Sequence, residues 1–198
     1  MNDSDSLLAA DGLVVNRVAQ SALVTLDLAA LVPAPDPAEV DLVPFLYRGL
    51  VLRERDFRAA LADLDTAPFA GRDVAVFCST DALVPTWAYL LVAARLSGVA
   101  ASVGAGRAAD VQRDRFAQAL DAHDWTAYAG KPVVVKGCGT DRVPLDAFVR
   151  ATSHLMGVAA KVLYGEPCSS VPIWRRAAAT SATSGTARPA GPPPRVSS

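Results

Sequence analysis

The stretch RDVAVFCSTDALVPTWAYLLVAARLSGVAASVGAG occupies residues 72–106, and KPVVVKGCGTDRVPLDAFVRATSHLMGVAAKVLYG follows 59 positions later at residues 131–165. Without any gap, the two stretches share Val-Pro before an apolar run and Gly-Val-Ala-Ala after it. The agreement continues upstream, where Phe57 falls on Phe116. Agreement of this density over a whole supersecondary unit predicts an internal duplication, with repeats at about 55–105 and 114–164.

Each copy is predicted to fold as a strand, a helix and a second strand. Short apolar runs such as VAVF and VVV are typical of strands that are buried on both faces. Proline is favoured in a first helical turn, so each Val-Pro is expected to open a helix, and Gly98 and Gly157 are expected to end the two helices. Strands that alternate with helices indicate right-handed crossovers. We therefore expect an α/β fold with a mainly parallel sheet and helices on both faces.

The predicted organisation is a single α/β domain at residues 13–175 between two disordered ends. Residues 1–12 form the first end. Residues 176–198 form an Ala/Ser/Pro-rich tail without periodicity, which buries too little apolar surface to offset the entropy of ordering.

Composition narrows the classes of function. Lys and Arg number 19 against 20 Asp and Glu, so the net charge is −1 and a basic nucleic-acid-binding surface is not expected. Arg95 interrupts the apolar stretch from Trp87 to Gly106, which argues against a membrane span. The first residues lack a secretory pattern and the three cysteines lack the spacing of a disulfide framework, so a cytoplasmic location is predicted.

The three cysteines carry the functional prediction. Cys78 and Cys138 each follow a predicted strand and precede a helix, and Cys168 follows the last strand of the second repeat. Ligands of open α/β sheets bind beyond the carboxyl ends of the strands, and a helix N-terminus lowers the pKa of a nearby thiol. We expect the thiols to meet at a [4Fe–4S] cluster with one open iron, or at zinc with a fourth N or O ligand. Burial of each cysteine as a small apolar side chain is the competing interpretation.

Other polar residues near the cysteines are weaker candidates. Glu166 precedes Cys168 by two positions and is a candidate metal ligand, or else an ordinary loop glutamate. Asp81 and Asp141 are candidate ligands or proton carriers, although an aspartate before a helix is more often an N-cap. His123 and His154 are interpreted as solvated side chains.

Two further functions stay open. In a thiol enzyme, Cys138 or Cys78 would attack a substrate, with Asp141 or Asp81 nearby and helix N–H groups stabilising charge. No histidine lies near either cysteine in the sequence, so no general-base pair is evident. The other possibility is a non-catalytic interaction scaffold.

Five segments carry a resemblance to a known family: NRVAQSALVTLDL, LVLRERDFR, CSTDALVPTWAYLL, VVVKGCGTDRVPLDAFV and VLYGEPCSSVPI. They resemble the bacterial domain-of-unknown-function family 2480, over Asn16 to Arg176. The chain departs from the family at the Pro-rich PAPDP insert and in its long tail. The family has no assigned activity, and its members tend to be found among iron–sulfur assembly genes. The resemblance therefore implies an accessory role in iron–sulfur metabolism, with iron–sulfur assembly proteins as partners.

Overall fold

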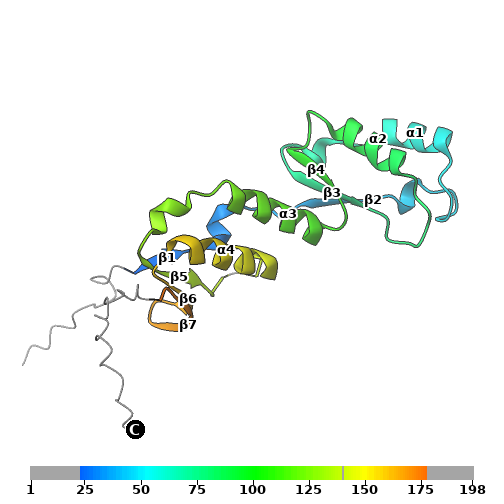
Figure 1. Cartoon of the computed structure of the whole chain (residues 1–198). Helices are drawn as coiled ribbons and strands as arrows, with labels where there is room; N and C mark the ends of the chain where they lie inside the picture. Colours follow the sequence, from blue (N-terminus) through cyan, green and yellow to red (C-terminus); the bar gives the residue numbers. More distant parts are fainter. Residues whose placement is uncertain (1–22, 140, 178–198) are drawn as a thin grey trace, which may run out of the picture.

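The structure is a computed structural model that describes residues 23–139 and 141–177. The described chain forms an α/β fold with four α-helices and two mainly parallel sheets (Figure 1). The α/β class is thus confirmed. The N-terminal end predicted to be disordered lies outside the described residues, as does the C-terminal tail beyond residue 177.

Two sheets take the place of the single sheet that was expected. The four-stranded sheet, here called sheet A, has the order β1-β5-β6-β7, and the three-stranded sheet B has the order β2-β3-β4. Every neighbouring pair is parallel except β6 and β7, which form an antiparallel hairpin. The strands of sheet A are β1 (Val24–Leu26), β5 (Pro132–Lys136), β6 (Lys161–Glu166) and β7 (Ser169–Arg175). The strands of sheet B are β2 (Ala38–Asp41), β3 (Asp73–Phe77) and β4 (Ser102–Ala105).

Each sheet has a hydrophobic core of its own. In sheet B, Val74 and Val76 pack in one cluster with Phe57 and Val92. In sheet A, the corresponding cluster joins β5 and β6 to side chains of the helices at residues 108–121 and 145–158, among them Phe116. The helices are α1 (Glu54–Ala62), α2 (Thr86–Leu96), α3 (Ala108–Asp121) and α4 (Leu145–Val158). The short 3-10 helices are η1 (Leu28–Leu31), η2 (Val43–Phe45), η3 (Ala67–Phe69) and η4 (Trp125–Tyr128).

Helix α3 lies between the two sheets (Figure 1). It supplies Phe116 to the core of sheet A and also contacts β3 and β4. The approach to sheet B is close, since a Cβ added at Gly104 would lie 2.8 Å from Cγ2 of Val111. A glycine in β4 therefore makes room for α3.

The two helices that follow Val-Pro begin where the sequence predicted, and one of them ends later. Pro85 and Pro144 are N-cap residues with extended backbone (ψ 146° and 147°), so α2 and α4 begin directly after them, at Thr86 and Leu145. Gly98 follows α2 with φ +77°, as predicted for a helix stop, whereas Gly157 lies inside α4. Within the described residues, no helix is long and apolar enough to cross a membrane.

Candidate functional site

The structure does not bring the three cysteines together. Cys78 follows β3 in sheet B, Cys138 follows β5 in sheet A, and Cys168 lies in the turn between β6 and β7. In residues 23–139 and 141–177, no group of three or more His, Cys, Asp or Glu side chains is placed to hold a metal ion. Joint ligation by the three cysteines is therefore not supported, because β3 and β5 belong to different sheets.

Cys78 fits the competing interpretation of a small apolar side chain. It is half-buried and packs against the core of sheet B, as Val84 and Trp87 also do. Its Sγ lies 3.5 Å from Oγ1 of Thr80. These contacts are those expected of a core cysteine.

The other two cysteines lie at the carboxyl edge of sheet A. The β5–β6 ladder pairs Lys136 with Gly165, and the Gly137 N–H then donates to the Gly165 carbonyl at 3.2 Å. One residue further, the Cys138 N–H donates to Oε1 of Glu166 at 3.3 Å. Cys168 is two residues beyond Glu166, in the hairpin turn. We call Lys136, Cys138, Glu166 and Cys168 the thiol edge.

The thiol edge raises the pKa of Cys138. The largest cause is the hydrogen bond that the thiol donates to the Glu166 carboxylate, followed by the negative charge of Glu166. Burial and the charge of Cys168 act in the same direction, and only Lys136 opposes them. The predicted activation by a helix N-terminus is thus wrong for Cys138. It precedes α4 by seven positions and has the Glu166 carboxylate as a hydrogen-bond partner.

Lys136 is itself held by Asp27, which follows β1. Its Nζ lies 2.7 Å from Oδ2 of Asp27. This hydrogen bond lowers the pKa of Asp27 and raises the pKa of Lys136. The carboxyl ends of β1, β5 and β6 are therefore joined by polar contacts across one edge of sheet A.

Asp81 and Asp141 do not cap the helices that follow them. The N-caps of α2 and α4 are Pro85 and Pro144, and neither helix has a side-chain cap hydrogen bond. Both aspartates are exposed. Asp141 lines a hollow at the start of α3, together with Asp36 and Arg142.

The histidines belong to an aromatic cluster at η4, before the amino end of β5. His154 is exposed and stacks on Trp125, with ring centroids 4.7 Å apart and planes 6° apart. His123 is half-buried, and its Nε2 lies 3.1 Å from the Tyr128 hydroxyl. Both rings are thus held by neighbouring aromatic residues, and the cluster lies at the opposite edge of sheet A from Cys138.

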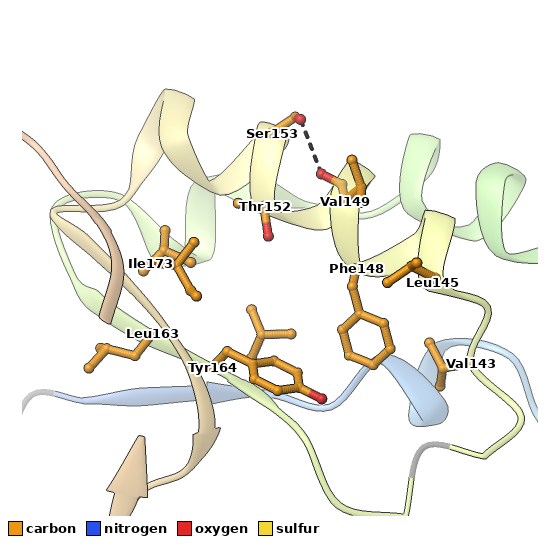
Figure 2. Close-up of a pocket in the computed structure, with 11 residues that line it drawn as sticks. Val143, Leu145, Phe148, Val149, Thr152, Ser153, Leu163, Tyr164 and Ile173 are labelled. Carbon is orange, nitrogen blue, oxygen red and sulfur yellow. Dashed lines mark hydrogen bonds between the residues drawn. The ribbon is translucent and has the colours of Figure 1, made fainter. Parts of the chain in front are cut away.

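A cavity that the sequence analysis missed lies between α4 and strands β5, β6 and β7 (Figure 2). Its volume is approximately 610 Å³, and none of its described lining residues is charged. It was missed because the hairpin strand β7, which forms one wall, was not predicted. The lining residues are Val135, Val143, Leu145, Phe148, Val149, Thr152, Ser153, Val162, Leu163, Tyr164 and Ile173.

The walls of this cavity are apolar and its few polar groups are hydroxyls. Figure 2 shows the Tyr164 ring below α4 and the Thr152 hydroxyl pointing towards the sheet. The Phe148 ring meets Tyr164 edge-on, with centroids 5.7 Å apart. Ser153 donates to the Val149 carbonyl, whereas among the described residues the hydroxyls of Thr152 and Tyr164 have no hydrogen-bond partner. These two hydroxyls remain available to a ligand.

Tyr164 connects the cavity to the thiol edge. A Cβ added at Gly137 would lie 3.2 Å from Cζ of Tyr164 and 3.2 Å from Cα of Gly165. The tyrosine ring therefore packs closely against the backbone that leads into Cys138, and only a glycine fits there without a shift of its neighbours. Cavity and thiol edge thus adjoin.

Sheet B carries a smaller cavity in the position equivalent to that of the larger cavity on sheet A. It has a volume of approximately 200 Å³ and lies between α2, β3 and β4. Each described lining residue lies 59 positions before a lining residue of the larger cavity. For example, Leu90 corresponds to Val149 and Tyr89 corresponds to Phe148. The lining residues of the smaller cavity are Val76, Tyr89, Leu90, Ala93, Val103, Gly104 and Ala105.

Comparison with known proteins gives a family and no function. No curated protein and no solved structure matches the chain. One family model, described as protein of unknown function (DUF2480), matches residues 12–176, which confirms the resemblance found in the sequence. This chain therefore belongs to the DUF2480 family.

Proposed function

We propose that this protein is a non-catalytic binding protein that takes up an uncharged, apolar small molecule between α4 and β5–β7. The observation that carries the proposal is the cavity of approximately 610 Å³ whose described lining residues include no charge. Ligand pockets typically measure about 300–1,000 Å³ and combine apolar walls with a few polar groups that fix orientation. The free hydroxyls of Thr152 and Tyr164 supply such groups.

The two cavities also support a duplication as the origin of the fold. Strands β3 and β5 begin at residues 73 and 132, and helices α2 and α4 begin at residues 86 and 145, so both offsets equal the 59 residues of the sequence repeat. We infer that the second copy acquired β7, which adds a wall to the larger cavity. Ile173 of β7 lines the larger cavity and has no counterpart in the smaller one.

Binding is better supported than thiol catalysis. A nucleophilic cysteine acts as its thiolate, and Glu166 favours the neutral thiol of Cys138. Both histidines are engaged in the aromatic cluster around Trp125. Neither histidine is therefore placed as a general base for Cys138, and the carboxylate that its thiol contacts, Glu166, raises the pKa of the thiol.

An accessory role in metal or iron–sulfur handling is the second candidate. It rests on two thiols and one carboxylate at one edge, namely Cys138, Cys168 and Glu166. These three side chains are not placed to hold a metal ion by themselves, so a partner such as an iron–sulfur assembly protein would have to complete the site. Iron, sulfide and zinc analysis of protein purified without oxygen tests this role, with Cys78→Ser as the control that should retain any metal.

The small-molecule proposal is tested with a fluorescent apolar probe, Nile red, and two matched variants. Val149→Arg places a charge in the larger cavity, and Leu90→Arg places the same charge at the corresponding position of the smaller one. The two side chains are similarly exposed, at 58% and 64%. We expect Val149→Arg to weaken probe binding at least about tenfold, because a bound apolar probe would remove water from the charged side chain without replacing its hydrogen bonds, and Leu90→Arg to leave it nearly unchanged.

Circular dichroism and thermal unfolding establish that both variants are folded. Equal probe binding by wild type and Val149→Arg would contradict the proposal. Sedimentation velocity on the same samples tests whether a second copy of the chain fills the cavity instead of a small molecule. A wild-type dimer that Val149→Arg dissociates would show that it does.

A further inference from the structure

The hairpin between β6 and β7 brings Cys168 beside the loop that carries Cys138. The β5–β6 register pairs Lys136 with Gly165, and continuing it by two residues places Cys138 opposite Pro167, the neighbour of Cys168. The loop stays alongside β6 after β5 ends, since Gly137 and Cys138 both donate hydrogen bonds to residues of β6. Two cysteines that are 30 positions apart in the sequence thus share one corner of the fold.

The spacing of neighbouring strands suits a disulfide between Cys138 and Cys168. Neighbouring strands lie about 4.8 Å apart, and a disulfide joins residues whose Cα atoms are about 4.4–6.8 Å apart. Both cysteines are exposed, so an external reagent reaches them. The residues on either side of Cys138 are glycines, and Gly139 has φ +65° with open space around it, which gives the loop latitude to adjust.

We propose that Cys138 and Cys168 form a reversible intramolecular disulfide by exchange with a low-molecular-weight disulfide. A thiolate of one cysteine attacks the external disulfide, forms a mixed disulfide and releases one small thiol. The second cysteine attacks the protein sulfur of the mixed disulfide, closes the Cys138–Cys168 bond and releases the second small thiol. The protein loses two electrons and two protons, and the external disulfide is reduced to two thiols.

The neighbouring charges assign an order to the two steps. Glu166 accepts the hydrogen bond of the Cys138 thiol and outweighs the opposing charge of Lys136, so the proton is held on Cys138. Attack on the external disulfide is therefore assigned to Cys168, and Cys138 is the resolving thiol. The bond would fix the hairpin turn next to Tyr164, at one end of the larger cavity.

The test treats the reduced full-length protein with oxidised glutathione and follows its intact mass. Wild type and the control Cys78→Ser are expected to lose about 2 Da, the two hydrogens of the thiol pair. Trypsin should then release residues 137–142 linked to residues 162–175. Cys138→Ser is expected to stop at a glutathione adduct on Cys168, and Cys168→Ser is expected to form its adduct on Cys138 more slowly.

Two results would overturn the proposal. One is a wild-type protein that keeps separate glutathione adducts on Cys138 and Cys168 without closing the bond. The other is a cross-link that involves Cys78 or joins two chains. Because the readout is mass and not ligand binding, the outcome is independent of what occupies the cavity.

Discussion

Glu166 controls Cys138 through two contacts that act on different parts of the residue. Its Oε1 accepts the Cys138 N–H at 3.3 Å, which holds the loop against the end of β6. Its carboxylate also accepts a hydrogen bond from the thiol, which favours the protonated form and raises the pKa of Cys138. One side chain therefore positions the cysteine and lowers its reactivity at neutral pH.

Replacing Glu166 by Gln is expected to make Cys138 more reactive. Removing the negative charge lowers the pKa of the thiol towards its ordinary value, so a larger fraction is thiolate at pH 7.5 and alkylation by iodoacetamide is faster, by several-fold. Peptide mass spectrometry over time measures this rate at Cys138 alone. Lys136→Met supplies the opposite control, because loss of the cation should slow the reaction. An unchanged rate in Glu166→Gln would show that the carboxylate does not govern this thiol.

The residues at the ends of strands were partly predictable. Apolar runs indicate where a strand ends, so Cys138 and Cys168 were correctly expected at the carboxyl edge of a sheet, whereas Glu166 was left as either a site residue or a loop glutamate. The same signal does not say which strands share a sheet. Cys78 was therefore expected beside the other two thiols, although β3 pairs with β2 and β4 while β5 pairs with β1 and β6.

Among the elements, the carboxyl end of helix α1 receives its side-chain hydrogen bonds from a residue of the neighbouring helix α2. The last turn of α1 contains no basic residue. Arg95 of α2 donates instead to the carbonyls of Leu61, Ala62 and Leu64, at 3.1 Å each. Carbonyls at a helix end have no partner within the helix, so this arginine satisfies the end of α1 and fixes α1 against α2.

Arg95→Met is expected to destabilise the unit around sheet B by about 1–3 kcal/mol, because several carbonyls lose a charged donor. Hydrogen exchange of the α1 amides, measured by mass spectrometry, should rise together with a lower urea midpoint. Arg150→Met is the control, since among the described residues Arg150 pairs only with Asp146 of the same helix, in an exposed ion pair, and its loss is expected to leave the urea midpoint nearly unchanged. Similar losses in both variants would show that Arg95 does not complete α1.

The elements also show where local patterns stop being informative. Helical periodicity and buried strand runs predicted α1–α4 and strands β3–β6, because packing of one face dictates those patterns. Strand β7 was missed, since Pro172 lies within it and proline argues against a strand except at an edge. The turn before it depends on Gly165, with φ +122°, where an added Cβ would lie 2.8 Å from the Ser169 carbonyl oxygen. With β7 absent from the prediction, the cavity beside it was absent too.

In the whole molecule, arginines hold residues 32–37, which cross from sheet A to sheet B between η1 and β2 and are here called the crossing segment. Arg142 pairs with Asp36 at 2.6 Å, and Arg72 donates to the Asp36 carbonyl at 3.0 Å. Arg115 of α3 donates to the carbonyls of Pro33 and Pro35. Arg115 also pairs with Asp73 of β3 at 2.8 Å, where both side chains are at most 20% exposed. Arg115 thus links its own helix, α3, to the crossing segment and to sheet B.

Arg115→Met is therefore expected to uncouple the unfolding of the two sheets. Trp87 packs on the core of sheet B, and Trp125 and Trp174 pack on the core of sheet A, so variants that keep only Trp87 or only Trp125 report each sheet separately. With Arg115 present, both reporters should share one urea midpoint, as expected of the single domain predicted for residues 13–175. Loss of its charged hydrogen bonds, worth about 1.5–3 kcal/mol each, should separate the two midpoints.

Arg113→Met on the same helix is the matched control for this uncoupling. Within the described part of the chain Arg113 pairs only with Asp110, and both side chains are about half exposed, so the two reporters should stay coincident. Coincident midpoints in Arg115→Met, shifted together to lower urea, would mean that the packing of α3 on both sheets is sufficient to unite them. Separation in that variant alone would locate the coupling at the arginine that spans α3, the crossing segment and β3.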